Sequence, residues 1–215
     1  PMQLDWQGES YTLVYNGELY NTPELRTALQ NKGHSFTGHS DTEVLLHGYE
    51  QWGVDLLQRV RGMFTFVIWD KNKQELFGAR DHFGIKPFYY AKMNGTFMYA
   101  SEIKSLLRHP DFVKELNAEA LKPYMTFQYP AIGETFFKGV YKLPEGHYFT
   151  YRDGKMDIHR YYDEDFREGK QKLGELVNSI DQTVCDSVKA HQIADVEVGS
   201  FLSSGVESSY VAAAA

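Results

Sequence analysis

The chain has 215 residues, of which 42% are hydrophobic, and it can bury one good-sized core or one core and the start of a second. Its net charge is −7 and it contains no run of Lys or Arg longer than two, so we expect no basic patch that binds the phosphate backbone and no nucleic-acid partner.

Other features of the composition concern compartment and fold. No window reaches the roughly 18 apolar residues that a membrane helix needs, and the first ten residues lack a signal peptide pattern, so we expect no membrane partner and a cytoplasmic location. The lone cysteine, Cys185, cannot form an internal disulfide, which fits a reducing compartment. The chain has 15 Tyr and 14 Phe in strand-like runs, which indicates broad sheets.

The first elements are a strand and two helices. An apolar run at residues 11–15 stops at Asn16-Gly17, a dipeptide typical of tight turns, so the local pattern predicts a strand that ends in a turn. A helix is predicted from Thr22 to just before Gly33, because it has Pro in its first turn and a glycine beyond its end. A capping box predicts that a second helix begins at Ser40.

Residues 63 to about 101 alternate between β-rich runs and turn dipeptides, which predicts an antiparallel meander. Short helices are expected at about 102–108 and 118–125, followed by strand-like runs at 141–151 and 158–162. We therefore place the end of the first domain near residue 165.

The remainder predicts the start of another domain. After the polar stretch 164–172, apolar residues recur at helical spacing from Leu173 to Val188, which predicts a long helix that buries Cys185 as a small core residue. Residues 196–202 predict a strand that runs into a Gly/Ser loop and an Ala-rich helix. The sequence shows no internal repeat.

Three segments together resemble the family of glutamine-hydrolysing asparagine synthetases. The first is YNGELYN followed by SDTEVLLHGYEQWG, and the second is RGMFTFVIWD with LFGARDHFGIKPFYY and YASEIKSLL. The third, VGSFLSSGVESS, is similar to the pyrophosphate-binding loop of ATP pyrophosphatases. Each segment is weak evidence alone, but their order and spacing cover most of the chain.

The resemblance implies an α+β fold. Residues 1–165 would form a class II glutamine amidotransferase domain, an N-terminal-nucleophile-type α-β-β-α sandwich of two antiparallel sheets. Residues 166–215 would form the first βα unit of an α/β ATP-pyrophosphatase domain. The implied enzyme is a ligase: glutamine hydrolysis supplies ammonia to a β-aspartyl-adenylate made from aspartate and ATP, with Mg²⁺, giving asparagine, glutamate, AMP and pyrophosphate. Homodimerisation is among the expectations.

The resemblance also implies a glutamine site. Asn16 and Gly17 would supply the side-chain amide and backbone N–H that stabilise the oxyanion formed from the carboxamide. Glu18 and Asp41 would hold the α-amino group of glutamine through charge-assisted hydrogen bonds. The alternative for Asn16-Gly17 is a plain hairpin turn, and the alternative for Asp41 is an interaction with the helix dipole.

The third segment would form a loop that cradles pyrophosphate, since small residues let backbone N–H groups approach phosphate oxygens. It departs from the usual SGGxDS form, with Ser204 at a glycine position and Glu207 at the aspartate expected near magnesium. Glutamate has the right charge and one more methylene group, which puts the metal geometry in doubt. The expected ATP and pyrophosphate contacts are Leu202, Ser203, Ser204, Gly205, Val206, Glu207, Ser208 and Ser209, with Glu207 as the metal ligand.

Arg80, Asp81 and Gly84 match a family segment and are expected to be structural, shaping the interior face and the ammonia route. A satisfied Arg80–Asp81 ion pair is the plain interpretation, and we interpret His82 as a loop histidine.

The catalytic cysteine of the family is expected at the mature N-terminus. This chain begins at Pro1 and has no cysteine before Cys185, so we expect it to be incomplete at both ends and inactive as a glutaminase by itself. Two alternatives stay open: a related amidotransferase with a different acceptor, and a non-catalytic regulatory or assembly module.

Overall fold

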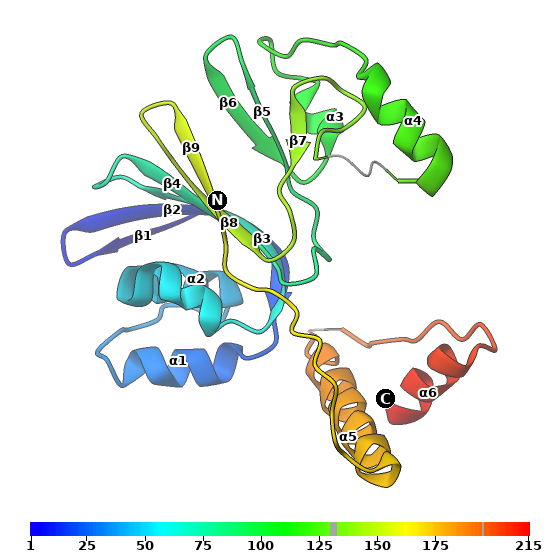
Figure 1. The fold of residues 1–215 in the computed structure, drawn as a ribbon. Coiled ribbons are helices and arrows are strands. Elements are labelled where there is room, and N and C mark those ends of the chain that lie inside the picture. Colours follow the sequence, from blue (N-terminus) through cyan, green and yellow to red (C-terminus); the bar gives the residue numbers. More distant parts are fainter. Residues whose placement is uncertain (130–132, 195) are drawn as a thin grey trace. The chain divides into compact units, whose positions relative to one another are not determined.

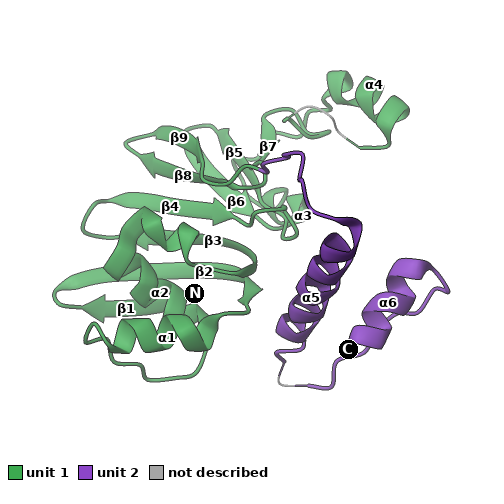
Figure 2. Ribbon diagram, turned by 60° about the horizontal axis from the view of Figure 1, so that its bottom comes forward, with its two compact units in different colours: residues 1–163 green, residues 164–215 purple. Residues whose placement is uncertain are grey.

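The computed structural model describes residues 1–129, 133–194 and 196–215. The chain divides into two compact units, residues 1–163 and residues 164–215, which are coloured green and purple in Figure 2. Within the described ranges, no helix combines the length and apolar character needed to cross a membrane.

The described residues of the first unit form two antiparallel sheets (Figure 1). The larger has six strands, in the spatial order β1 (Met2–Trp6), β2 (Glu9–Leu19), β3 (Gly62–Asp70), β4 (Glu75–Arg80), β8 (His147–Arg152) and β9 (Lys155–Arg160). The smaller has three, in the order β6 (Thr96–Ala100), β5 (Tyr89–Met93) and β7 (Val140–Lys142).

Helices lie on the outer faces of these sheets. Two of them, together with a 3₁₀ turn, pack on the large sheet, and a one-turn helix packs on the small sheet. The helical elements of this unit are α1 (Thr22–Gln30), α2 (Asp41–Trp52), η1 (Gly53–Gln58), α3 (Ile103–Leu106) and α4 (Ala118–Phe127).

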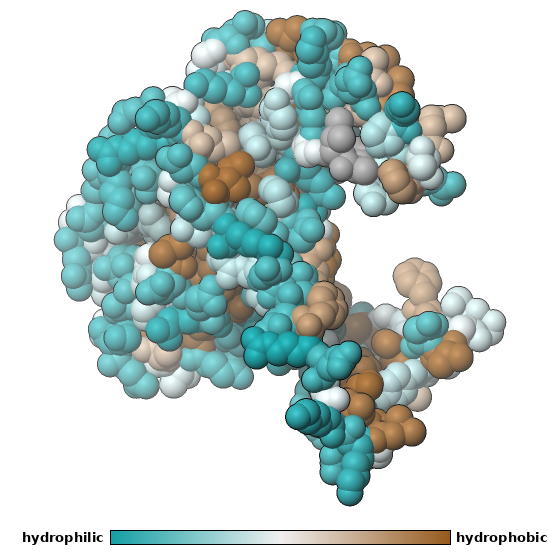
Figure 3. Space-filling view, viewed as in Figure 1, coloured by the Kyte–Doolittle hydropathy of each residue, from teal (hydrophilic) through white to brown (hydrophobic). Residues whose placement is uncertain are grey.

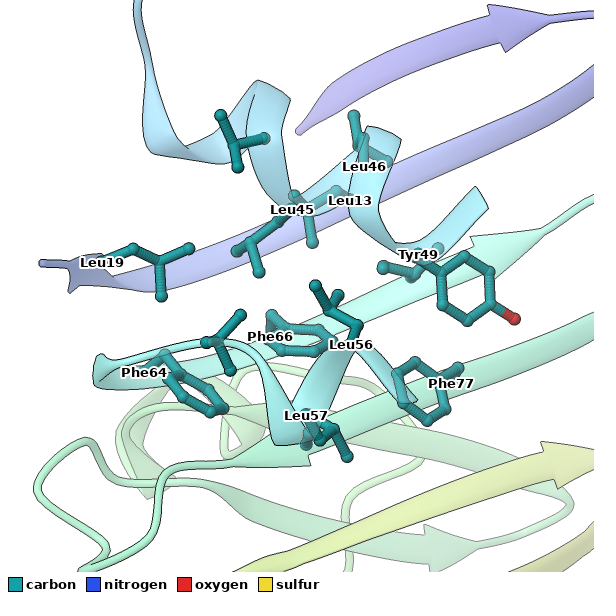
Figure 4. Packing of buried hydrophobic residues seen from close by; sticks show 14 of the residues in the cluster. Leu13, Leu19, Leu45, Leu46, Tyr49, Leu56, Leu57, Phe64, Phe66 and Phe77 are labelled. Atoms are coloured by element: carbon teal, nitrogen blue, oxygen red, sulfur yellow. The ribbon is translucent and has the colours of Figure 1, made fainter. Parts of the chain in front are cut away.

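Buried apolar residues of the described ranges form three clusters, which fill the spaces between the layers. The cluster between the helices and the large sheet includes Leu45 of α2 and the β3 residues Phe64 and Phe66, as Figure 4 shows. A second cluster lies between the two sheets and contains Val67, Phe88, Leu143 and Phe149. A third covers the other face of the small sheet, with Ala91, Met98, Leu106 and Val140. The predicted α-β-β-α sandwich of two antiparallel sheets is confirmed.

Alternation along β3 explains why this strand contacts two layers. Successive side chains of a strand point to opposite faces, so Phe64, Phe66 and Ile68 face the helices while Val67 faces the small sheet. Because both faces are covered, the strand is apolar on both sides, with Thr65 as the polar residue within the run.

The predicted turn at Asn16-Gly17 is wrong. Both residues lie inside β2, which continues to Leu19 and pairs with β3. Hydrogen bonding to β3 outweighs the local turn preference of the dipeptide. The tight turn lies earlier, between β1 and β2, where Gln7 and Gly8 have φ values of 51° and 90°.

The capping box at α2 is only half formed. The Glu43 backbone N–H donates to Ser40 Oγ at 3.3 Å, which places Ser40 at the N-cap as predicted. The Glu43 carboxylate instead accepts hydrogen bonds from the N–H groups of Thr37 and Gly38. Burial would raise the pKa of Glu43, but these hydrogen bonds outweigh it and lower the pKa.

The second unit consists of α5 (Leu173–His191), a connecting segment and α6 (Val206–Ala214). The helix predicted from Leu173 is confirmed. The strand predicted at 196–202 is not formed, because a strand needs a hydrogen-bonded neighbour and the described part of this unit offers none. Apolar side chains of α5, α6 and the segment between them are exposed (Figure 3). Cys185 was predicted to be a buried core residue, but it is only half-buried.

Candidate functional site

Asn16 lies in a cavity between the two sheets of the first unit. Alternation along β2 directs its side chain away from the helices, toward the end of β6. The cavity measures about 170 Å³ and is lined by residues of β2, β3 and β6 with Phe88 and Ser101. The Asn16 Nδ2 group donates a hydrogen bond to Ser101 Oγ at 3.0 Å. This bond links the amide to a residue 85 positions later in the chain, and the second N–H hydrogen of the amide has no acceptor among the described residues.

Gly17 lies where β2 and β3 approach too closely for any side chain. A Cβ atom there would lie 2.3 Å from Met63 O, 2.8 Å from Phe64 Cα and 2.8 Å from Tyr15 Cε2. Two of these atoms belong to the β3 backbone, which cannot move independently of its ladder. Glycine is therefore required for the pairing that carries Asn16.

Asp41 is held against β2 although it starts α2. Its Oδ2 atom accepts hydrogen bonds from Tyr15 OH at 2.8 Å and from the Leu19 backbone N–H at 3.2 Å. Burial, and then the neighbouring Asp41 carboxylate, raise the pKa of Tyr15 above its ordinary value, so the phenol stays a donor. The other oxygen, Oδ1, accepts only a long bond of 3.3 Å from Thr42 Oγ1 within the described residues.

Glu18 is half-buried on β2, and its place in the alternation puts it on the same face as Asn16. Asp41 bonds instead to Tyr15, whose side chain packs with the helix-facing cluster. The two carboxylates predicted to share one ammonium group therefore flank the C-terminal part of β2 from its two faces. Asn16, Gly17 and Glu18 therefore lie in the C-terminal part of β2, and Asp41 of α2 contacts the same part of that strand.

Arg80 and Asp81 do not pair with each other, which corrects the plain ion-pair interpretation. Among the described residues, Arg80 donates to the backbone carbonyls of Gly84, Lys86 and Leu143, at 2.6, 2.7 and 2.7 Å. Backbone carbonyls satisfy the guanidinium because the loop after β4 folds around it.

The Asp81 carboxylate binds backbone N–H groups of the same loop. Its two carboxylate oxygens accept hydrogen bonds from the backbone N–H groups of Phe64, Phe83, Ile85 and Lys86, at 2.9 to 3.2 Å. The loop that leads from β4 toward the small sheet is thus built around two buried charges.

His82 lies beside this loop among aromatic rings. Its ring contacts Tyr162 at 4.6 Å and Tyr161 at 5.4 Å between centroids, both edge-on. Burial lowers the pKa of His82, so its neutral form is favoured. This packing is that of a structural residue.

Two residues at the site were missed by sequence reasoning. Thr65 is directly opposite Asn16 in the β2–β3 ladder and lines the same cavity. Ser101 follows β6 and accepts the Asn16 hydrogen bond. A polar residue inside the apolar run of β3 was a visible signal for Thr65, whereas Ser101 could be placed only by knowing how the sheets face each other.

The loop before α6 is closed by serine side chains. Ser208 Oγ donates to the Gly205 carbonyl at 3.1 Å and accepts from the Ser203 N–H at 3.3 Å. Ser204 has φ of 61°, a left-handed conformation in which glycine costs less. Backbone N–H groups and hydroxyls are donors suited to phosphate oxygens.

Glu207 lies exposed in the first turn of α6, the element whose start supplies the free N–H groups of the loop. Across the described residues, no group of three or more His, Cys, Asp or Glu side chains could hold a metal ion. Magnesium commonly takes one or two carboxylates with phosphate oxygens and water, so one glutamate fits that pattern.

Two solved structures share this fold. A glutamine phosphoribosylpyrophosphate amidotransferase from Bacillus subtilis matches 99% of this chain and 46% of its own, with a TM-score of 0.55 and 19% identity. An allosteric regulatory enzyme of purine biosynthesis matches 76% of this chain and 31% of its own, with a TM-score of 0.54 and 21% identity. The fold is that of the N-terminal-nucleophile amidotransferases.

The family model described as a glutamine amidotransferase domain matches residues 1–162, and one described as asparagine synthase matches residues 179–215. The chain belongs to the glutamine amidotransferase domain family.

Curated relatives extend the similarity across both units. Asparagine synthetases [glutamine-hydrolyzing] 1 and 3 of Bacillus subtilis are 41% and 37% identical, over 99% and 100% of this chain. Amidase chyE of Penicillium rubens is 34% identical to this chain, and the match covers 96% of this chain and 31% of the amidase. The chain spans about a third of the length of the synthetases, 34% and 35%.

Proposed function

We propose that this chain provides the glutamine-binding part and the first nucleotide-binding segment of a glutamine-hydrolysing asparagine synthetase. The observation that carries the proposal is the Asn16 amide in the cavity between the sheets, which donates one hydrogen bond to Ser101 and has a second N–H hydrogen without an acceptor among the described residues. An amide donor fixed in this way suits the stabilisation of negative charge on a carboxamide oxygen. The similarity to named synthetases over both units supports the same function.

In this proposal the residues near the end of β2 bind and stabilise, and none of them is the nucleophile. Asn16 Nδ2 and the Gly17 backbone N–H donate to the oxygen of the attacked carboxamide, which becomes negatively charged. Because these donors are already oriented, little reorganisation is needed when that charge develops. Glu18 and Asp41 Oδ1 approach from the two faces of β2, so they would have to meet the α-ammonium group of glutamine beyond the end of that strand, where both would accept its hydrogen bonds.

The loop from Leu202 to Ser209 is proposed to receive the phosphate groups of ATP, with Mg²⁺ held by Glu207 and by phosphate oxygens. The metal would neutralise phosphate charge there. Residues 1–165 would act as the amidotransferase domain and 166–215 as the start of the ATP-pyrophosphatase domain. Glutamine, aspartate and ATP would be the substrates of this cytoplasmic enzyme, which would work as a homodimer.

The test uses the protein from its complete reading frame, supplied with glutamine, ATP, magnesium and aspartate. We expect asparagine and pyrophosphate as products. Asn16→Ala should reduce the glutamine-dependent rate by about a hundredfold, the usual effect of losing an oxyanion donor. The same variant should keep its rate when ammonia replaces glutamine.

Asn178→Ala is the matched control, because Asn178 is exposed on α5 and should leave both rates unchanged. An Asn16→Ala variant with an unchanged glutamine-dependent rate contradicts the assigned role. Absence of both glutamate and asparagine in the wild-type reaction would instead favour the non-catalytic module.

A second candidate is an amidotransferase that serves another acceptor. The similarity to fungal proteins named amidase chry2 and amidase chyE favours it, since both are 34% identical to this chain. Release of glutamate without asparagine in the assay above would select this candidate.

A further inference from the structure

We propose that the Thr65 hydroxyl binds the carboxamide nitrogen of glutamine in the cavity between the sheets, an inference that rests on the function proposed above. Thr65 lines this cavity together with Asn16 and Ser101. The residue is 4% exposed, and within the described part of the chain its Oγ1 atom has no hydrogen-bond partner. A buried hydroxyl that lines a cavity without a protein partner is suited to an occupant of that cavity.

The free energy of this arrangement makes the absence of a partner informative. A buried hydroxyl without a hydrogen bond destabilises the folded state relative to a hydroxyl that has one. Valine has nearly the same shape and carries no such cost, and the neighbours of Thr65 along β3 are the apolar residues Phe64 and Phe66. The strand thus keeps a hydroxyl where an apolar side chain would give a more stable protein, as binding sites commonly do.

The position of Thr65 relative to Asn16 fits the two ends of a carboxamide. The two residues are direct partners in the β2–β3 ladder, so their side chains project from the same face. Cβ atoms of such partners lie about 4.5–5.5 Å apart. A carboxamide carries its oxygen and its nitrogen on one carbon atom, so its oxygen can accept from Asn16 Nδ2 while its nitrogen donates to Thr65 Oγ1.

The size and lining of the cavity agree with a small polar group. Its volume of about 170 Å³ exceeds the share of one water molecule in the liquid, about 30 Å³, several times over. Val67, Phe88 and Ala100 give it apolar walls, against which the two polar contacts would orient the group.

The experiment compares Thr65→Val and Thr65→Ser in the protein from its complete reading frame. Two substrates are used, glutamine and glutamate γ-methyl ester, whose γ-ester group has no N–H to donate to Thr65. Thr65→Val should lower kcat/KM for glutamine about tenfold, equivalent to about 1.4 kcal/mol, and change that for the ester by less than about twofold. Thr65→Ser retains the hydroxyl and should hydrolyse both substrates at close to wild-type rates.

Thermal unfolding of the same variants separates binding from folding. Removal of an unsatisfied buried hydroxyl should leave the Tm of Thr65→Val equal to or above that of the wild type, while its glutamine hydrolysis falls. A structural hydroxyl would give the opposite result, with a lowered Tm and an equal loss on both substrates.

Three outcomes would overturn the proposal. One is unchanged glutamine hydrolysis by Thr65→Val, and another is an equal loss on glutamine and on the ester. A wild-type protein that releases glutamate from neither substrate overturns the proposed function, and this inference with it. The first two leave the proposed function intact, so the two failures are distinguishable.

Discussion

The substitution Gly17→Ala tests the close approach of β2 and β3. The added Cβ atom would lie 2.3 Å from Met63 O, while ordinary van der Waals contact begins near 3.4 Å. The two strands would therefore have to separate locally by about 1 Å. Overpacking usually costs 1–3 kcal/mol, and backbone on the far side of the contact favours the upper end, about 3 kcal/mol. For a chain of this size the Tm should fall by about 6–12 °C.

The assay is unfolding in urea, followed by near-ultraviolet circular dichroism of the aromatic core. Gly133→Ala is the matched control, because a Cβ atom at Gly133 meets no atom of the described residues within 4 Å and its φ is outside the left-handed region. The control should remain within about 0.5 kcal/mol of the wild type. If Gly17→Ala is as stable as the control, the close approach does not constrain this position and our reasoning is refuted.

Three further substitutions test the surroundings of the site. Ser101→Ala removes the acceptor of the Asn16 amide and should lower kcat/KM for glutamine about fivefold, while the ammonia-dependent rate stays unchanged. An equal loss in both assays would refute the proposed orientation of the amide by Ser101. Asp81→Asn replaces one of the two acceptor oxygens and should reduce the free energy of unfolding in urea by about 2–4 kcal/mol. The control Asp5→Asn changes an exposed residue and should not, so equal stability of the two variants would contradict the role of the Asp81 carboxylate. Burial, and then the neighbouring His34, lower the pKa of His47 from 6.5, so the unfolded chain binds more protons than the folded one and the free energy of unfolding should fall as the pH falls below 6.5. His47→Asn should weaken this pH dependence in urea titrations, and an unchanged slope would exclude His47 as its source.

The sheets and helices were predictable because their local patterns agree with their tertiary environment. β3 is apolar on both faces and is covered on both faces. α2 begins at the expected serine, since Ser40 accepts the Glu43 N–H hydrogen bond. Where the local conformational preference of a segment agrees with its tertiary contacts, the sequence alone is enough to predict the element.

Asn16-Gly17 shows where they diverge. The dipeptide favours a turn, yet β3 pairs with it, Asn16 with Thr65 and Gly17 with Phe64, and keeps it extended. Periodicity within a short window contains no information about that partner. The requirement for glycine at position 17 likewise comes from the backbone of β3.

The surroundings of the predicted site were the least accessible from sequence. Ser101 reaches Asn16 only because the two sheets face each other across the cavity. For the segment 196–202 the failure was of the opposite kind, because an apolar run predicts a strand whether or not a neighbouring strand is present.

The contrast between the two units has a consequence for calorimetry. All three buried clusters are formed by residues before position 164, whereas the described residues of α5 and α6 include none that is fully buried. Cooperative melting requires a shared core, so the heat-absorption peak of this chain should report on the first unit alone. The helical signal of α5 and α6 should instead fade gradually with temperature, without a peak of its own.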